Sequence, residues 1–435
     1  MTTSISFTRC PSPSVSDIYT KLANHCDSAT FQCHPIDTTK NTQWIKGIRC
    51  LKKLKLIVDS LDASLFDTIS TTLQSIHLQV RNYDIPSIKL PPSLRSFRFE
   101  GRKVPEIINV KELSNFSEAT ITFFNKPHFE SSETWPSYDI FEAVQSSIDD
   151  LPSSITKLDL RMAPLCQEPK KQLSLTTLPQ LEDLTIEFRM LDHSVSSLPL
   201  KNVRVPDAIN ERLPNTLKSL RISFDWKTPT DLSYFLRNSI LPLNSLTELY
   251  LMSIGSVGVD DDDAGALNQC VLSSSICSSL EILRIQAFES ADLSNFWQSF
   301  CLPLQSLSRM DFFIGSDSYL IINEWPPHLN LLTIDFDTTV GVDRSFTDGC
   351  SRVELHGISK SSLKYIRLSG CGNITLKCGP DDEIETIIFS YDEEDGVELT
   401  KSIDRFEDGI LNMPESIDCG NDIKFVVDGE WRLYK

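Results

Sequence analysis

The sequence predicts an α/β solenoid in which short parallel strands stack into one curved sheet on the concave side. Short helices or irregular segments then form the convex side. Three observations predict this fold: the apolar pattern L-x-x-L-x-L recurs along most of the chain, many copies lie 21 or 22 residues apart, and a Leu-Pro or Trp-Pro pair precedes several copies. A single short strand cannot bury its apolar face, whereas stacked strands share a continuous core.

The repeated pattern is frequent enough to be distinguished from the chance occurrence of L-x-x-L-x-L in a leucine-rich chain. Six of the intervals between successive copies are 21 or 22 residues. The copies begin at Leu51, Leu73, Leu94, Phe116, Ile155, Leu181, Leu200, Leu217, Leu246, Leu280, Leu307, Leu329, Cys350, Leu363 and Ile384. A period of 20 to 29 residues with this pattern is typical of leucine-rich repeats.

Proline marks the approach to several strands, as in LPPSLRSF (90–97), LPSSITKL (151–158), LPNTLKSL (213–220) and WPPHLNLL (325–332). Proline has no N–H and stiffens the turn that leads into a strand. On these residues the sequence resembles the leucine-rich-repeat superfamily over residues 46–390, and its LPxSLxxLxL form looks like the FNIP-type and irregular fungal repeats. The stretch SSLKYIRLSGCGNIT (361–375) is similar to the cysteine-containing repeats of F-box proteins, with Cys371 and Ile374-Thr375 in the expected places.

The sequence departs from the family at the position eight residues after the first leucine, where regular repeats carry Asn or Cys. Most copies have another residue there, for example Asp59, Arg81, Arg102 and Phe124. These residues cannot build an asparagine ladder between neighbouring backbones. The sequence therefore predicts the stacked sheet but leaves the regular horseshoe curvature open.

The sequence predicts three structural regions along the chain. Residues 1–45 carry no repeat and form an N-terminal segment in which Val15–Cys26 is a possible capping helix. Residues 46–390 form the solenoid. Residues 391–435 form an acidic cap that ends in a hairpin over residues 423–435, with Asp428-Gly429 as a two-residue turn.

Longer spacings between repeats leave room for helices on the convex side. Apolar residues three or four positions apart predict helices over residues 137–149, 230–240 and 290–301. Trp297 falls in the third of these, and we interpret it as a core residue rather than a cofactor contact.

The charge argues against general nucleic-acid binding, because 60 acidic residues face 41 basic ones and the net charge is −19. The charge is uneven: residues 1–110 hold 14 basic and 9 acidic residues, whereas residues 381–435 hold 5 and 17. The first residues contain no apolar signal-peptide region, and no apolar run is long enough to span a membrane. Twelve cysteines without a secretion signal indicate reduced thiols, so a cytoplasmic or nuclear location is expected.

Motifs for catalysis or cofactor binding are absent: there is no GxxxxGK[ST], GxGxxG, HExxH, GxSxG or CxxC. His25-Cys26 and Cys33-His34 lie too far apart for an ordinary zinc site. Asp260–Asp263 does not fit the EF-hand pattern and reads as a solvated acidic loop. We therefore expect a non-enzymatic protein without a cofactor or metal.

The residue between the last two apolar positions of each repeat is expected to face the concave side. This row reads Lys55, His77, Arg98, Thr120, Asp159, Thr185, Arg204, Arg221, Tyr250, Arg284, Asp311, Thr333, Glu354, Arg367 and Ile388. Its basic and aromatic members are the candidate partner-binding residues, namely Lys55, His77, Arg98, Arg204, Arg221, Tyr250, Arg284 and Arg367. The alternative is cross-strand pairing with acidic neighbours, such as Lys157 with Asp183 or Arg309 with a nearby Asp. Both interpretations stay open at this point.

A flat sheet suits a protein partner better than a small molecule, and an acidic protein fits the basic row best. The resemblance to F-box proteins implies a substrate-recognition subunit of a ubiquitin ligase that contacts an adaptor. That family begins its adaptor-binding module with LPxE, and residues 1–50 lack it. The alternative is a regulator of a small GTPase, because one family of GTPase activators joins such repeats to an acidic C-terminal region. The sequence does not predict the identity of the partner, the oligomeric state or the regulation.

Overall fold

The computed structural model covers the whole chain and describes the following residues: 4–7, 16–32, 51–58, 72–80, 87–101, 105–123, 140–162, 174–188, 213–224, 240, 243–253, 279–287, 293–315, 318–337, 352–356, 362–369, 373–378, 386–392, 398–404, 423–427 and 430–434. The chain divides into two compact units. Unit 1 comprises Met1–Val203 and Asp207–Leu217, and unit 2 comprises Arg204–Pro206 and Lys218–Lys435.

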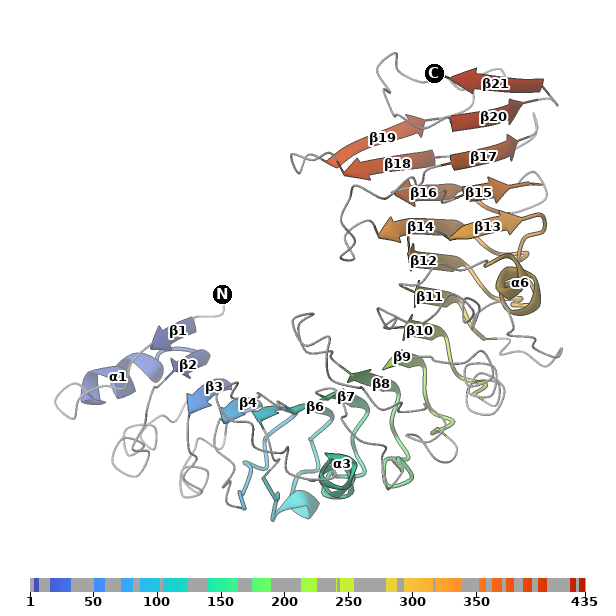
Figure 1. Cartoon of the computed structure of the whole chain (residues 1–435). Coiled ribbons are helices and arrows are strands. Elements are labelled where there is room, and N and C mark those ends of the chain that lie inside the picture. The colour runs from blue at the N-terminus through green and yellow to red at the C-terminus, as the bar shows by residue number, and fades with distance from the viewer. Residues whose placement is uncertain are drawn as a thin grey trace, which may run out of the picture. The chain divides into compact units, whose positions relative to one another are not determined.

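Unit 1 contains one parallel sheet whose strands follow the order of the sequence (Figure 1). Each strand pairs in parallel with the next one along the chain. The strands are β1 (Ser4–Phe7), β2 (Ser28–Gln32), β3 (Lys53–Val58), β4 (Ser75–Val80), β5 (Ser96–Gly101), β6 (Glu118–Phe123), β7 (Lys157–Met162) and β8 (Asp183–Phe188). This stacking confirms the predicted solenoid. Strands β1 and β2 lie within residues 1–45, so the sheet begins earlier than the repeat pattern does.

The core of unit 1 follows from the alternation of side chains along each strand. In β3 the residues Leu54, Leu56 and Val58 are buried, whereas Lys55 and Ile57 between them are only partly buried. In β4 the residues Ile76, Leu78 and Val80 occupy the same positions. The first apolar residue of each described repeat in unit 1 is also buried, so the inward side chains form one continuous apolar layer.

A ladder of hydroxyl groups takes the place of the missing asparagine ladder. The Ser or Thr just before the first apolar residue of a repeat donates a hydrogen bond to the carbonyl oxygen of the first apolar residue of an earlier repeat. The pairs in unit 1 are Thr72 with Leu51, Ser93 with Leu73, Ser154 with Phe116, and Thr216 with Leu181; those in unit 2 are Ser279 with Leu246 and Ser362 with Leu329. The distances range from 2.6 Å to 3.1 Å. These bonds satisfy carbonyl groups that the strands leave open.

A shared carbonyl reinforces the same junctions. The carbonyl oxygen of Gln74 accepts the N–H groups of both Arg95 and Ser96, at 2.8 Å and 3.0 Å. The pattern repeats along both units, for example at Glu281, whose carbonyl accepts from Ser308 and Arg309. The approach to each strand is therefore fixed by main-chain bonds that do not depend on side-chain type.

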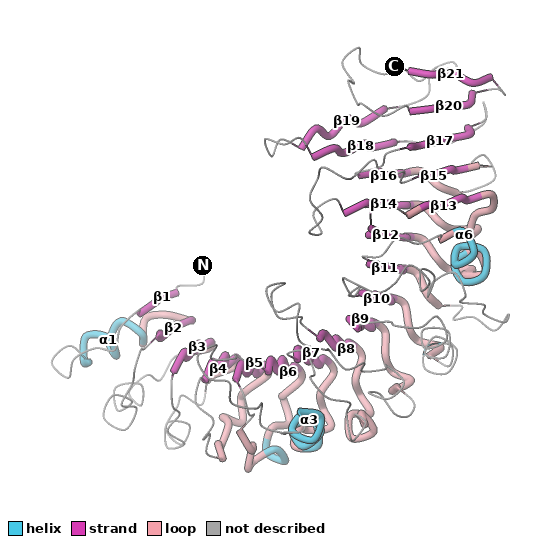
Figure 2. The backbone as a smooth tube through the Cα atoms, in the orientation of Figure 1, coloured by secondary structure: helices cyan, strands magenta, loops and turns pink. Residues whose placement is uncertain are grey.

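The side of unit 1 opposite the strands carries helices and irregular segments (Figure 2). Helix α3 (Ile140–Asp149) lies in the range predicted to be helical, and a 3-10 helix, η3 (Val110–Glu112), follows β5. The buried amide of Asn109 accepts from Leu90 N and donates to Leu90 O, which ties two successive segments together. Helix α1 (Ser16–Ala23) lies within the range expected for the N-terminal helix.

Unit 2 contains two sheets. The first has the order β9-β10-β11-β12-β14-β16-β18-β19 and is parallel up to β18, with β19 antiparallel. Its strands are β9 (Ser219–Phe224), β10 (Glu248–Ser253), β11 (Ile282–Ala287), β12 (Arg309–Gly315), β14 (Leu331–Asp337), β16 (Tyr365–Ser369), β18 (Thr386–Asp392) and β19 (Glu398–Asp404). The second sheet contains β13 (Tyr319–Ile322), β15 (Arg352–Leu355), β17 (Asn373–Cys378), β20 (Ile423–Val427) and β21 (Glu430–Tyr434).

From β12 to β18 the chain alternates between these two sheets (Figure 1). The prediction that Cys350-Val353-Leu355 belongs to the concave sheet is therefore wrong. Val353 and Leu355 lie in β15, which pairs with β13 and β17, so Glu354 does not belong to the row of side chains that contains Arg367. The same apolar alternation buries Val353 and Leu355 in the second sheet, and the pattern alone cannot distinguish the two sheets.

A short helical segment covers the outer edge of the second sheet. It consists of α6 (Ser294–Phe296) and the π-helical turn η6 (Trp297–Cys301), within the range predicted to be helical. Leu293 N donates to Tyr319 O, and Ile321 N donates to Ser294 Oγ, both at 3.0 Å. These bonds occupy main-chain groups of β13 that would otherwise form an open edge.

Trp297 is fully buried, as predicted for a core residue. Its ring contacts Phe312 and Trp325, at centroid distances of 6.1 Å and 5.6 Å, and its Nε1 donates to Glu324 O. Trp297 therefore links the segment before β12 to the segment that follows β13.

The C-terminal strands β20 and β21 form the predicted hairpin, which ends the second sheet. Several expectations lie outside the described residues, namely the repeat at Leu200, most of the helix over 230–240, the acidic stretch Asp260–Asp263, the Cys33-His34 pair and the turn Asp428-Gly429. In the part of the chain that the structure describes, no helix is long and apolar enough to cross a membrane. The chain is a leucine-rich-repeat solenoid with short helices beside its sheets.

Candidate functional site

The candidate site is the side of the strands that does not face the core, which we call the open face of each unit. In unit 1, three rows of side chains cross strands β3 to β8 because the strands pair in register. The first row is Lys53, Ser75, Ser96, Glu118, Lys157 and Asp183; the second is Lys55, His77, Arg98, Thr120, Asp159 and Thr185; the third is Ile57, Gln79, Glu100, Thr122, Arg161 and Glu187.

The candidate binding residues fall in the second row and form two groups. Lys55, His77 and Arg98 lie on adjacent strands of unit 1. In unit 2, Arg221, Tyr250 and Arg284 lie on adjacent strands, and Arg367 pairs in register with Thr333 farther along the sheet. Arg204 lies outside the described residues.

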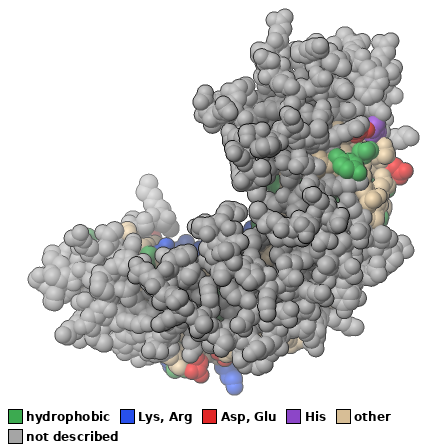
Figure 3. All heavy atoms as spheres, viewed as in Figure 1, with side chains coloured by type: hydrophobic (Ala, Val, Ile, Leu, Met, Phe, Trp, Pro, Cys, Tyr) green, Lys and Arg blue, Asp and Glu red, His purple; other side chains and the backbone are tan. Residues whose placement is uncertain are grey.

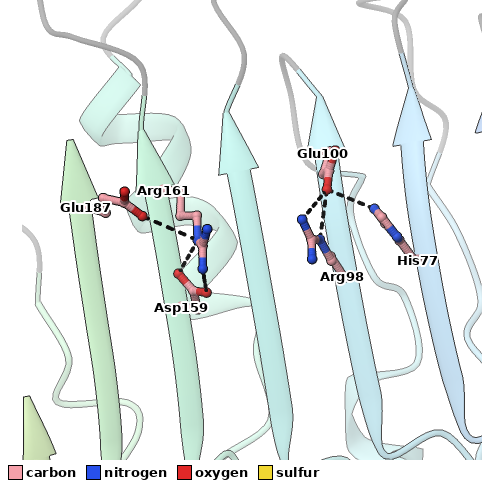
Figure 4. Close-up of polar contacts among 6 residues, drawn as sticks. All are labelled: His77, Arg98, Glu100, Asp159, Arg161 and Glu187. Carbon is pink, nitrogen blue, oxygen red and sulfur yellow. Dashed lines mark hydrogen bonds and ion pairs between the residues drawn. The ribbon is translucent and has the colours of Figure 1, made fainter. Parts of the chain in front are cut away.

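In unit 1 one carboxylate connects two of these residues. Glu100 Oε1 accepts from Arg98 Nε at 2.8 Å and from His77 Nε2 at 2.9 Å (Figure 4). Because a carboxylate can only accept, Nε2 carries the proton of the imidazole. Burial lowers the pKa of His77; Glu100 opposes this shift, and the positive charges of Arg98 and Lys55 add to it. The imidazole is therefore neutral near pH 7, and its hydrogen bond holds the Glu100 side chain in place.

A second polar network lies on the neighbouring strands β7 and β8. Arg161 donates to both oxygens of Asp159 at 2.8–3.0 Å, and its Nε lies 3.5 Å from Glu187 Oε2 (Figure 4). Lys157 Nζ lies 2.8 Å from Asp183 Oδ2. Hydrogen bonding to Asp159 and to Asp183 raises the pKa of Arg161 and of Lys157, respectively. These side chains are held in fixed positions by their neighbours on the sheet.

Thr122 lies between the two networks, in register with Glu100 and Arg161. Its side chain is buried, and its hydroxyl group has no hydrogen-bond partner among the described residues.

In unit 2 the open face begins with a stacked pair. The guanidinium carbon of Arg221 lies 4.6 Å from the centre of the Tyr250 ring, and Tyr250 Oη donates to Gln286 Oε1 at 2.7 Å. The ring is therefore fixed on one side by Gln286 and covered by Arg221. A cation over an aromatic ring adds modest stability when the pair is exposed.

Asp311 lies between two arginines on adjacent strands. Its Oδ2 is 3.0 Å from Arg284 Nε and 2.9 Å from Arg309 Nε. The contact with Arg309 is a hydrogen bond, whereas Arg284 Nε approaches Asp311 without hydrogen-bond geometry. The Asp311 side chain is only 2% exposed, so its charge is balanced almost entirely by these two guanidinium groups.

Of the two pairings weighed at the sequence level, Lys157 pairs with Asp183 across adjacent strands, whereas Arg309 pairs with Asp311 on its own strand β12. Arg98 and Arg284 also have acidic neighbours. Pairing within the sheet therefore accounts for part of the basic row. Arg221 and Arg367 remain exposed on the open face of unit 2.

Apolar side chains also lie on the open face of unit 2. Met252, Phe313 and Leu331 are partly buried, and Tyr365 is 39% exposed. They occupy the first and third rows of this face, beside the row that contains Arg221 and Tyr250. This face is therefore richer in apolar and aromatic groups than the open face of unit 1.

A separate surface lies over β13 and β15, where apolar side chains adjoin a histidine and acidic side chains (Figure 3). Tyr319 is 41% exposed there, and His356 Nε2 lies 3.1 Å from Glu354 Oε2. Across the described residues, no three His, Cys, Asp or Glu side chains come close enough together to hold a metal ion.

Sequence reasoning selected the second row, named only Lys157 and Asp183 of the first row, and missed the third row. Glu100, Arg161 and Glu187 each stand two residues after a member of the second row, and strand alternation places them on the same face. Extending the alternation by one more step would have found them.

Comparisons with known proteins give no family. No protein-family model matches the chain, and no curated protein matches it. Among solved structures the chain is similar to the functional domain of InlJ from Listeria monocytogenes, with 10% sequence identity and a TM-score of 0.30 over 87% of this chain and 79% of that one. The assignment of the fold rests on the strand pairing of the chain itself.

Proposed function

We propose that this protein is a non-enzymatic binding module that holds a protein partner on the open face of its sheet. The observation that carries the proposal is the group of side chains on the open face of unit 2, which joins exposed Arg221 and Arg367 to Tyr250, Phe313 and Tyr365. Arginine, tyrosine, phenylalanine and methionine are the residue types enriched at protein interfaces.

The geometry of Tyr250 supports this role. Its ring is held by the hydrogen bond to Gln286 and by the stacked guanidinium of Arg221. A side chain that is already ordered loses little conformational entropy when a partner binds. Tyrosine and arginine residues of this kind often contribute most of the binding free energy.

The proposal is tested by affinity capture with the full chain, followed by measurement of the dissociation constant with the purified partner. We expect Tyr250→Ala and Arg221→Glu each to weaken binding by about tenfold or more. The matched control is Lys111→Glu, which makes the same charge change at an exposed position of η3 in unit 1. If both open-face variants bind the partner as tightly as the control, this face is not the binding surface.

Substrate recognition for a ubiquitin ligase is a narrower form of this proposal and is supported only by the sequence resemblance. It requires residues 1–50 to contact an adaptor. Capture of a ligase adaptor by the full chain, and its loss when residues 1–50 are exchanged for an unrelated segment, would support it; capture of partners without an adaptor would contradict it.

Regulation of a small GTPase is supported only by the combination of repeats with an acidic C-terminal region. It predicts that the full chain changes the rate of GTP hydrolysis by a purified small GTPase and that Arg98→Ala or Arg221→Ala abolishes the change. An unchanged rate across a panel of small GTPases would exclude it.

A further inference from the structure

Charged side chains on the open face of unit 1 divide by sign along the sheet. On strands β3 to β5 this face carries Lys53, Lys55 and Arg98 against Glu100 alone. We call this region the basic half. On strands β6 to β8 it carries four carboxylates against two basic groups, a region that we call the acidic half; its members are Glu118, Asp159, Asp183, Glu187, Lys157 and Arg161.

Ion pairs within each half do not remove this division. In the basic half, Glu100 pairs with Arg98, while Lys53 and Lys55 form no ion pair among the described residues. His77 does not add to the charge near pH 7, because burial lowers its pKa. Two positive charges therefore remain on β3.

The acidic half keeps an excess of the opposite sign. Lys157 pairs with Asp183, and Arg161 pairs with both Asp159 and Glu187. Glu118 forms no ion pair among the described residues, although its charge contributes to raising the pKa of Lys157. An unpaired negative charge therefore remains on β6.

The two halves are far enough apart to act separately. Adjacent strands are about 4.8 Å apart, so β4 and β7, at the centres of the halves, are separated by roughly 14 Å. Charges in solution are screened over about 8 Å at physiological ionic strength. The excess charges therefore do not cancel each other, and each is available to a group that docks directly on it.

We propose that the open face of unit 1 binds a protein segment that is itself divided in charge, with acidic residues over β3 to β5 and basic residues over β6 to β8. This inference rests on the proposed protein-binding function and adds the chemistry of the partner and its orientation. A segment acidic along its whole length meets repulsion at Glu118. A basic one meets Lys53 and Lys55. Only a segment of both signs, placed in one direction across the strands, is complementary at both ends.

The experiment uses the full chain and three synthetic peptides of equal length. The first has a block of four Glu, a neutral spacer and a block of four Lys; the second has the same composition with alternating charges; the third replaces every Lys by Glu. Binding is measured by fluorescence anisotropy at low ionic strength. We expect the block peptide to bind about tenfold tighter than either of the others, because several surface pairs each contribute a small amount. Equal binding of the block and alternating peptides, or tighter binding of the all-Glu peptide, overturns the inference.

Orientation is read from a spin label on the acidic end of the block peptide. We expect the label to broaden the methyl resonance of Ile57, on β3, and to leave that of Thr185, on β8, sharp. Exchanging the charges of the protein with Lys53→Glu, Lys55→Glu, Glu118→Lys and Glu187→Lys should keep the affinity and move the broadening to Thr185. Thermal unfolding of the exchanged variant checks that it is folded. Broadening that stays at Ile57 in a folded variant, or that never differs between the two methyl groups, contradicts the inference.

Failure of this inference can be distinguished from failure of the proposed function. If the peptides show no preference while Arg221→Glu still abolishes capture of a natural partner, the inference about unit 1 fails and the proposed function stands. If no partner is captured by the wild-type chain, or if the variants of unit 2 have no effect, the proposed function fails whatever the peptides do.

Discussion

The hydroxyl group of Ser93 donates a hydrogen bond to the carbonyl oxygen of Leu73, 2.7 Å away and twenty residues earlier in the chain. The same bond links Ser154 to Phe116 and Ser279 to Leu246. Each donor directly precedes the first apolar residue of its repeat, at the junction where one strand is positioned against the preceding one. Side-chain hydroxyls at the start of the repeat thus form hydrogen bonds to the main chain of an earlier repeat. In regular leucine-rich repeats, asparagine side chains near the end of the repeat form such bonds.

The first prediction concerns this ladder. Thr216 Oγ1 lies 2.6 Å from Leu181 O, and Thr216→Val removes the hydroxyl while keeping the shape of the side chain. We expect Thr216→Val to lower the free energy of unfolding by about 1 kcal/mol, because a carbonyl at a packed junction loses its donor. Urea denaturation measures the loss. Thr216→Ser is the control, since it keeps the donor, and an equal loss in both variants would assign the effect to packing.

The second prediction concerns the carboxylate that balances two arginines. Asp311→Ala leaves Arg284 and Arg309 facing each other without the buried charge between them. We expect the free energy of unfolding to fall by about 2 kcal/mol, less than for a fully buried pair because both arginines reach solvent. Asp183→Ala, at a carboxylate that is 34% exposed and pairs with Lys157, should cost less than about 1 kcal/mol. Similar losses in the two variants would show that burial of Asp311 has no energetic consequence.

The third prediction is a pH dependence. Burial lowers the pKa of His77 in the folded chain, so between this value and the ordinary one the unfolded chain binds more protons, and stability rises with pH. The contribution of His77 is fully favourable above the ordinary histidine pKa and is lost as the pH falls below it. We expect wild type to lose more stability than His77→Gln between pH 7.5 and pH 5.5 in urea denaturation. Parallel curves for the two proteins would show that His77 titrates normally.

The fourth prediction concerns the covered edge of the second sheet. Ser294→Ala removes the acceptor for Ile321 N, on the outer strand β13. We expect the amide of Ile321 to exchange with solvent faster by about fivefold, because one buried hydrogen bond contributes roughly 1 kcal/mol. Ser299→Ala, in the same segment but with its hydroxyl on Asn295 O, is the control and should leave this amide unchanged. Equal exchange in all three proteins would mean that the helical segment does not protect the edge.

Much of the fold could be predicted from the sequence because the repeat and the strand alternation have the same cause. Each strand must bury one apolar face by stacking on the next strand. Leu54, Leu56 and Ile76 are apolar because their strands stack, and the positions between them face the opposite side for the same reason. The second row of the open face follows directly. The pairing of Glu100 with both Arg98 and His77 does not, since it depends on which neighbours meet across strands.

The second sheet of unit 2 could not be predicted in this way. A strand of four residues such as Arg352–Leu355 needs only two buried apolar side chains, and Val353 and Leu355 satisfy that in either sheet. Which of the two sheets this strand joins depends on the partner strands beside it, here β13 and β17. The hydroxyl ladder, in contrast, was visible in motifs such as LPPSL and LPNTL, in which the Ser or Thr before the leucine was the informative residue.

The ladder has a consequence for how such a chain can change during evolution. Its hydrogen bonds join residues 20 positions apart at Ser93 and 38 positions apart at Ser154, yet the junction is the same. The length of the loop between the end of one strand and the next rung is therefore under little geometric restraint, and doubling the length of such a loop costs only about 0.6 kcal/mol in closure entropy. New segments can be inserted between one rung and the next while the strands keep their register, so the periphery can diversify faster than the scaffold.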